Sequence, residues 1–84
     1  MQVTLKLYAT LTDHLPPAAR SGNQVALEVA EAATIPEVIA PYNLPPKLVH
    51  LVLVNGVYIA PAARETHALK AGDVLAIWPP IAGG

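Results

Sequence analysis

The sequence predicts a single α+β domain in which one short helix packs across one face of a five-stranded sheet. The chain has 84 residues, a length that allows one small domain with a thin core. Apolar and polar residues alternate in several short runs, which is typical of strands with one buried face. One short stretch has helical spacing, and it follows the second of these runs. The predicted order, β-β-α-β-β-β, therefore differs from the regular alternation of a parallel α/β sheet.

The first two strands are predicted to form an antiparallel pair joined by a loose loop. Residues 3–7 and 25–29 both carry an apolar side chain at every second position. Between them, residues 10–13 have a spacing similar to a capping box, which predicts a single helical turn. Pro16 and Pro17 end that turn, because proline lacks a backbone N–H and restricts the residue before it.

A short helix is predicted after the second strand. Thr34 and Glu37 have capping-box spacing, and the helix that they open has an apolar face within residues 35–39. Pro41 ends this helix, since its ring would clash with the carbonyl group of Glu37. Asn43 suits the left-handed position that follows many helices.

A β-hairpin gives the sharpest local signal in the sequence. Asn55 and Gly56 are the preferred pair for a type I′ turn, and β-branched residues flank them on both sides. This pattern predicts strands over residues 50–54 and 57–60. Residues 61–68 are then expected to cross the molecule as a loop.

The last strand is predicted over residues 74–78, after a turn built around Gly72 and Asp73. Two consecutive prolines stop this strand, because neither can donate a hydrogen bond to a neighbouring strand. The sequence therefore divides into one domain over residues 1–78 and an extended C-terminal tail over residues 79–84.

Composition and charge exclude several classes of function. The chain has no cysteine, and so no disulfide framework, no cysteine-bound zinc and no thiol catalysis. Five basic side chains stand against six acidic ones, and the net charge of −1 offers no basic stripe for nucleic acid. We find neither an apolar run long enough for a spanning helix nor a secretory signal, and therefore expect a cytoplasmic protein without a membrane partner.

Outside the tail, the sequence predicts no catalytic, metal or cofactor site. His14, His50 and His67 lack the spacing of a metal-binding pair, and no nucleotide-binding loop or hydrolase motif occurs. The chain is therefore not expected to be an enzyme by itself. Apolar residues make up 54% of the chain and charged ones only 13%, which indicates an apolar surface for a partner in addition to the core.

The C-terminal tail combines stiffness with small side chains. Ile81 and Ala82 follow the two prolines, and Gly83 and Gly84 leave the terminal carbonyl group uncrowded. Fully extended, these six residues reach about 20 Å, enough to enter a narrow tunnel in a partner. The terminal carboxylate is a poor electrophile until another protein adenylates it, after which a sulfur donor can displace AMP. We predict Gly84 as the reactive residue, and Pro80 to Gly83 as a partner-binding segment.

This ending resembles that of the MoaD/ThiS sulfur-carrier family. Residues 69–84, LKAGDVLAIWPPIAGG, are similar to the family pattern L-x-x-G-D-x-V, an apolar strand and P-P-x-x-G-G. Residues 51–56 and 6–11 match the family's central hairpin and its first strand with the following turn. The two prolines make the chain look more like the small subunit of molybdopterin synthase than the thiamine-pathway carrier.

The resemblance implies a ubiquitin-like β-grasp fold and a specific use of the tail. It implies that an E1-like adenylyltransferase uses ATP to activate Gly84, which then becomes a thiocarboxylate. It further implies that the tail enters a larger catalytic subunit and delivers sulfur to a pterin precursor. Other carriers supply thiamine synthesis, cysteine synthesis or tRNA thiolation, and a protein modifier conjugated through Gly84 would need the same activation. A β-grasp binding module with an inert tail is the remaining alternative.

Three further features have both a functional and a structural interpretation. Trp78, where the family often has phenylalanine, is either an anchor for a partner or a half-buried residue at the end of the sheet. Tyr8 and Tyr58 are expected to be neighbours on the exposed side of the sheet, where they form part of a docking patch. Arg64 and Glu65 are expected to be a solvated pair in a loop, or a recognition point for the activating enzyme.

Overall fold

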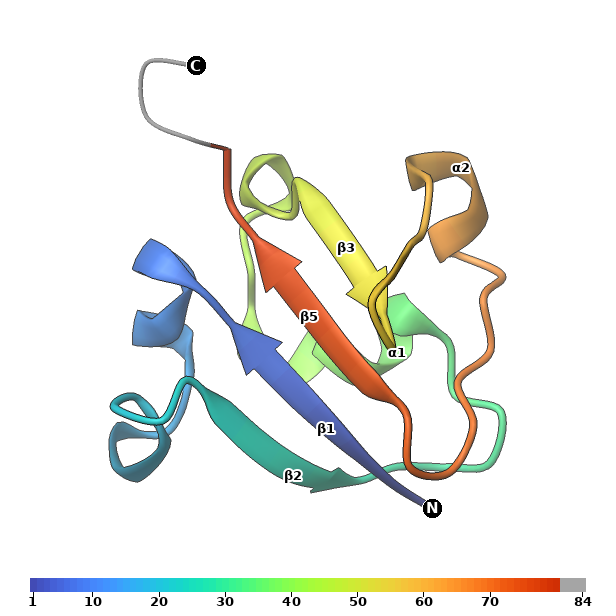
Figure 1. The fold of residues 1–84 in the computed structure, drawn as a ribbon, viewed down its shortest axis with the longest axis horizontal. Helices are drawn as coiled ribbons and strands as arrows, with labels where there is room; N and C mark the ends of the chain where they lie inside the picture. Colours follow the sequence, from blue (N-terminus) through green and yellow to red (C-terminus); the bar gives the residue numbers. More distant parts are fainter. Residues whose placement is uncertain (81–84) are drawn as a thin grey trace.

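A mixed sheet of five strands forms the body of the computed structural model, which describes residues 1–80 (Figure 1). The strands lie in the order β2-β1-β5-β3-β4 across the sheet. β1 and β5 run parallel, whereas the other neighbouring pairs are antiparallel. The predicted fold class and the predicted order of elements are confirmed. The bounds of the strands are β1 Gln2–Leu7, β2 Gln24–Glu28, β3 Leu51–Val54, β4 Val57–Tyr58 and β5 Val74–Trp78.

The hydrophobic core lies between this sheet and the helix α1, Ile35–Ile39, which lies behind the sheet in Figure 1. The strand register brings the apolar positions to one face, since Leu75 of β5 pairs with Leu5 on one side and with Val54 on the other. Ile35 and Val38 of α1 are buried against them. The buried strand residues on this face are Val3, Leu5, Leu7, Val52, Val54, Leu75 and Ile77.

The predicted capping box begins α1. The Glu37 carboxylate accepts hydrogen bonds from the backbone N–H of Thr34 at 2.9 Å and from its hydroxyl at 2.8 Å. Pro41 ends the helix as predicted, and a single 3₁₀ turn, Ala40–Tyr42, follows it. Asn43 has φ 54°, which confirms the left-handed residue predicted at this position.

The two hydrogen bonds from Thr34 lower the pKa of Glu37 below its ordinary value of 4.5, because both favour the charged carboxylate. We expect Thr34→Ala to raise this pKa part of the way back, since the backbone donor remains. The carboxyl carbon of Glu37, followed by NMR between pH 2 and 7, measures the shift.

The direction of the pKa shift also fixes its effect on folding. A depressed carboxyl pKa stabilises the fold above the unfolded-state pKa, and this contribution is lost as the pH falls through the lower, folded-state pKa. The pH dependence of stability below about pH 5 is therefore weaker in Thr34→Ala than in the unchanged chain. An identical Glu37 pKa in both proteins would contradict the capping geometry.

The segment between β1 and β2 differs from the prediction at its start. A 3₁₀ turn does form, Ala9–His14, but Thr10 does not cap it, because the turn already begins one residue earlier. The Thr12 hydroxyl donates instead to the carbonyl oxygen of Ala9 at 2.9 Å. Leu11 is fully buried, so core packing fixes this turn rather than a capping box.

The predicted hairpin is present, with Asn55 at φ 51° and Gly56 at φ 82°, as a type I′ turn requires. Its second strand, however, is shorter than predicted and ends at Tyr58. Ile59 turns into the core, and the predicted loop over residues 61–68 begins with a helical turn, α2, Pro61–Arg64. Proline is favoured in the first turn of a helix, and Pro61 is the first residue of α2.

The turn before β5 is tied to the hairpin turn by side-chain hydrogen bonds. The Asn55 amide group donates to the Asp73 carboxylate at 2.8 Å, and its oxygen accepts from the backbone N–H of Val74, also at 2.8 Å. The other Asp73 oxygen accepts from the backbone N–H of Lys70 at 2.9 Å, and Gly72 has φ 85°. The turn predicted around Gly72 and Asp73 is confirmed, and these contacts fix where β5 begins.

Candidate functional site

The candidate site is built at the end of β5, where the tail leaves the sheet. The backbone N–H of Tyr8 donates to the carbonyl oxygen of Ile77 at 3.2 Å on the β1 side. On the β3 side, the N–H of His50 donates to the carbonyl oxygen of Trp78 at 3.1 Å. The next two residues are prolines and have no N–H, so neither can donate to a neighbouring strand. β5 is thus held from both sides up to the residue that precedes the tail.

Of the six residues predicted for the site, the structure describes Trp78 and Pro80. Trp78 is half-buried at the end of β5, and Pro80 is exposed. The predicted residues 81–84, which include the reactive Gly84, lie outside the described part of the chain. Their roles therefore remain predictions.

Trp78 stacks on Tyr8, the residue that follows β1. The two ring centroids are 4.0 Å apart and the ring planes differ by 5°. Stacked aromatic rings restrict each other's rotation, so this contact fixes the side chain at the root of the tail. The stacking and the partial burial of Trp78 agree with the interpretation as a half-buried residue at the end of the sheet. The exposed part of its side chain is the part that a partner could contact.

An apolar surface extends from Trp78 across the sheet, on the side opposite α1. Trp78 pairs with Leu51 of β3, and Leu53 of β3 pairs with Tyr58 of β4, so their side chains share one face. Leu51 is 37% exposed and Tyr58 is 54% exposed. We call Tyr8, Leu51, Leu53, Tyr58 and Trp78 the open sheet face.

The expectation that Tyr8 and Tyr58 are neighbours is wrong. Tyr8 follows β1 and Tyr58 lies in β4, and both β5 and β3 separate these strands. The parallel pairing of β1 with β5 causes this separation, because it inserts the last strand into the middle of the sheet. Tyr8 therefore meets Trp78 instead.

Arg64 is not part of a solvated loop pair, in contrast to the expectation from the sequence. From the end of α2, its guanidinium donates to three carbonyl oxygens: those of Ile59 at 3.0 Å, Val49 at 3.2 Å and His50 at 3.0 Å. Since His50 also binds the carbonyl of Trp78, Arg64 supports the segment that holds the end of β5. No local pattern reveals this role, because the acceptors are backbone atoms of distant residues.

We expect Arg64→Ala to destabilise the fold by about 2 kcal/mol, because it leaves three carbonyl oxygens without a charged donor. The matched control is Glu65→Ala at the exposed neighbouring position, with an expected change within about 0.5 kcal/mol. Urea denaturation followed by circular dichroism measures both. Equal, small effects of the two substitutions would restore the interpretation as a solvated pair.

Neither a metal site nor a membrane span is found in residues 1–80. No group of three or more histidine, aspartate or glutamate side chains in this range is placed to hold a metal ion. The His14 ring instead lies 3.0 Å from the carbonyl oxygen of Tyr42. No helix in the same range combines the length and apolar character needed to cross a bilayer.

The mixed sheet, with one helix between its two antiparallel hairpins and a tail on its central strand, defines a ubiquitin-like β-grasp protein. SAMP1 from Haloferax volcanii is similar over the whole of both chains, with 25% identity and a TM-score of 0.65. Another structure of H. volcanii small archaeal modifier protein 1 gives 24% identity and a TM-score of 0.63, with 95% of this chain and 98% of that chain covered.

A third similar structure is the complex of subunits 1 and 2 of molybdopterin-converting factor from Helicobacter pylori 26695. The match covers 100% of this chain and 100% of the matched chain, with 20% identity and a TM-score of 0.58, and this likeness concerns the fold. Among curated proteins, no sequence matches at a significant level. The ThiS family model matches residues 14–84, and the chain belongs to this family, within the ubiquitin-like MoaD/ThiS group.

Proposed function

We propose that this chain is a sulfur carrier whose own C-terminus, at Gly84, is the reactive group. The observation that carries the proposal is the end of β5, which is hydrogen-bonded on both sides up to Trp78 and is followed directly by Pro-Pro-Ile-Ala-Gly-Gly. A rigid root followed by a stiff, slender segment presents a carbonyl carbon to the active site of another protein. Membership of the ThiS family supports the same use of the tail.

The chemistry requires two steps on the terminal carboxylate, both performed by an E1-like partner. A carboxylate oxygen first attacks the α-phosphorus of ATP, which forms an acyl adenylate and releases pyrophosphate. Sulfide then attacks the acyl carbon, and AMP leaves with the electron pair of the broken C–O bond. The resulting thiocarboxylic acid is far more acidic than a thiol, whose pKa is about 8.5, and it is ionised at neutral pH. The ionised sulfur is the nucleophile that the carrier delivers.

The acceptor that we favour is a molybdopterin precursor, held by a larger catalytic subunit. One of the similar structures is a complex of two subunits of molybdopterin-converting factor, which supports a larger partner for this chain. The open sheet face is apolar and continuous with the root of the tail, so a partner that takes the tail also covers Leu51 and Trp78. We propose that this activation takes place in the cytoplasm.

An intact-mass assay tests the carrier chemistry directly. The full chain is incubated with ATP, sulfide and an E1-like adenylyltransferase from the same genome. We expect the mass to rise by the difference between one sulfur and one oxygen atom, and to stay unchanged when ATP is left out. An unchanged mass with every such activating enzyme of the genome would overturn the proposal.

A second candidate function is protein modification through Gly84, which the similarity to small archaeal modifier protein 1 favours. The same acyl adenylate would then transfer to a lysine amine of a target instead of to sulfide. Lysines carrying a Gly-Gly remnant after proteolysis of cell extracts would identify this fate. Carriers for thiamine synthesis, cysteine synthesis or tRNA thiolation share the thiocarboxylate and differ only in the enzyme that accepts the sulfur.

A further inference from the structure

β2 forms one edge of the sheet, and half of its backbone groups point away from β1. The N–H of Val29 donates to the carbonyl of Met1 at 2.8 Å, and the N–H of Leu7 donates to the carbonyl of Asn23 at 3.0 Å. The hydrogen-bonded residues of β2 are therefore the odd-numbered ones, because the direction of backbone groups alternates along a strand. Gln24, Ala26 and Glu28 direct their N–H and C=O groups outward, where no strand of residues 1–80 pairs with them.

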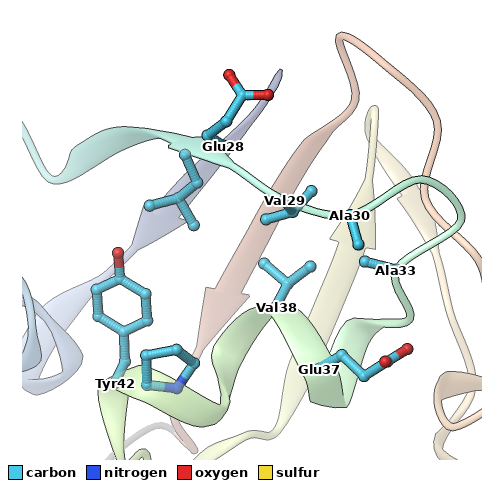
Figure 2. A pocket seen from close by; sticks show the side chains of 9 residues that line it. Glu28, Val29, Ala30, Ala33, Glu37, Val38 and Tyr42 are labelled. Atoms are coloured by element: carbon cyan, nitrogen blue, oxygen red, sulfur yellow. The ribbon is translucent and has the colours of Figure 1, made fainter. Parts of the chain in front are cut away.

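A groove runs beside this edge, between β2 and α1 (Figure 2). Leu27 of β2 and Val29, directly after this strand, belong to one wall, and α1 with the turn after it forms the other. The Tyr42 ring closes one end, with its hydroxyl directed towards β2 (Figure 2). Partial burial raises the pKa of Tyr42 above its ordinary value of 10.0, so the hydroxyl is a neutral donor at physiological pH. The apolar and aromatic lining residues are Leu27, Val29, Ala30, Ala33, Val38, Pro41 and Tyr42.

Carboxylates flank the groove, and no basic side chain lines it. Glu28 at the end of β2 and Glu37 on α1 both belong to its walls (Figure 2). Glu31, in the connection between β2 and α1, is a third exposed carboxylate in the same segment. Residues 28–37 thus hold half of the six acidic side chains of the chain, and two of them, Glu28 and Glu37, lie on opposite walls of the groove. Glu28 also contacts the N-terminal amine at 3.0 Å and remains 71% exposed.

We propose that β2 and this groove are a docking site for an extended segment of a partner protein, which adds to the sheet as a sixth strand. Backbone hydrogen bonds to Ala26 and Glu28 would hold the segment, and its alternate apolar side chains would lie in the groove. The acidic flanks select a segment with lysine or arginine beside the apolar residues. A second copy of this chain fits less well, because its own β2, QVALE, carries a carboxylate and no basic residue.

The docking site is separate from the tail. Glu28 pairs with Gln2 at the start of β1, whereas Leu7 at the other end of β1 pairs with Ile77, next to the root of the tail. Gln2 and Leu7 are five residues apart along β1, which corresponds to roughly 17 Å. A partner on β2 therefore leaves both the tail and the open sheet face accessible, and it can hold the carrier while another enzyme acts on Gly84.

A display experiment with the full chain tests the site. Random dodecapeptides are selected against the immobilised protein, and the enriched peptides are synthesised and titrated into isotope-labelled protein. We expect apolar residues at alternate positions with a flanking lysine or arginine. We also expect the amide NMR signals of Ala26 and Glu28 and the methyl signals of Val38 to shift, while the signals of Trp78 stay unchanged.

Ala26→Pro isolates the contribution of the edge. Proline removes the outward N–H of residue 26 and leaves the hydrogen bonds between β2 and β1 intact, because Ala26 is not a hydrogen-bonded partner of Thr4. We expect peptide affinity to fall about tenfold, the value of one lost backbone hydrogen bond in a site with no alternative donor. Ala26→Val keeps the N–H and is the matched control, with unchanged affinity. Thiocarboxylation of Gly84 in both variants verifies that they are folded.

Glu37→Gln tests the charge preference, since glutamine retains the capping geometry at this position. The affinity of basic peptides is expected to fall about threefold, and its dependence on salt to weaken. Three results would overturn the proposal: no peptide enriched above the bare matrix, equal binding to Ala26→Pro and Ala26→Val, or shifts confined to the open sheet face. Shifts of β2 signals with the concentration of the protein alone would assign the edge to a second copy instead.

Discussion

A chain with one phenylalanine appended after Gly84 is expected to gain sulfur at least about a hundredfold more slowly than the unchanged chain. The carbonyl carbon of Gly84 then belongs to a peptide bond, which ATP does not activate, and the new terminal carboxylate carries a bulky side chain beside it. In the proposed mechanism, the activating enzyme places the terminal carboxylate in line with the α-phosphorus of ATP, and a shift of one residue moves that carboxylate by about 3.5 Å. Misplacement of this size removes most of the rate advantage of an oriented reaction, so we expect the rate of sulfur incorporation to fall at least about a hundredfold. The intact-mass assay measures it.

The control uses the same polypeptide. A carboxypeptidase that removes aromatic residues and stops at glycine regenerates the Gly84 terminus, and the treated protein must recover the full rate. Deletion of Gly83 and Gly84 is expected to give a second inactive variant with the folded body unchanged, because β5 ends at Trp78 and the core cluster ends at Ile77. If the extended chain gained sulfur as fast as the natural one, Gly84 would not be the reactive residue.

Local sequence patterns predicted most strands of this fold because their ends are marked by residues with strong backbone preferences. β5 was predicted over residues 74–78, which are its observed bounds, since the turn at Gly72 precedes it and proline follows it. The hairpin at Asn55 and Gly56 was equally well marked, because both residues tolerate positive φ. The helix α2 was not predicted, because its four residues span little more than one helical turn and show no helical periodicity.

Contacts across the sheet were beyond the reach of local patterns. The sequence indicates which face of each strand is apolar, but it does not indicate that β5 lies between β1 and β3. Because this strand order was not predicted, Tyr8 was wrongly expected beside Tyr58. In the structure, Tyr8 stacks on Trp78 of β5, the strand next to β1. Arg64 was misinterpreted for a related reason, because its acceptors are carbonyl oxygens that any residue type supplies.

Sequence patterns do not reveal the groove beside β2, for a different physical reason. Leu27, Val29 and Val38 have the spacing of ordinary core residues, and the core does contact all three. The side chains of Leu27 and Val29 are only partly covered, because α1 is short and ends before Pro41. An edge strand and a short helix leave a channel that neither element reveals when it is considered alone.

Trp78→Ala is expected to weaken binding of the larger subunit at least about thirtyfold, which corresponds to the loss of one anchoring residue at an interface. The substitution removes the largest side chain of the open sheet face and leaves Tyr8 without its stacking partner. Trp78→Phe is the matched control, because a second aromatic ring preserves the stacking, and we expect its effect to be within about threefold. Isothermal titration with the large subunit of a molybdopterin synthase from the same genome measures both variants.

The position of Trp78 separates an effect on binding from an effect on folding. Its side chain is half-buried and lies on the face opposite α1, so its loss leaves the packing of Leu5, Leu75 and α1 unchanged. Trp78→Ala is therefore expected to remain folded at 25 °C, with its circular dichroism spectrum and its β5 amide signals retained. Binding of Trp78→Ala as tight as that of Trp78→Phe would show that the partner contacts the tail alone. The open sheet face would then have no part in docking. The partner would recognise the chain through the tail that begins at the two prolines.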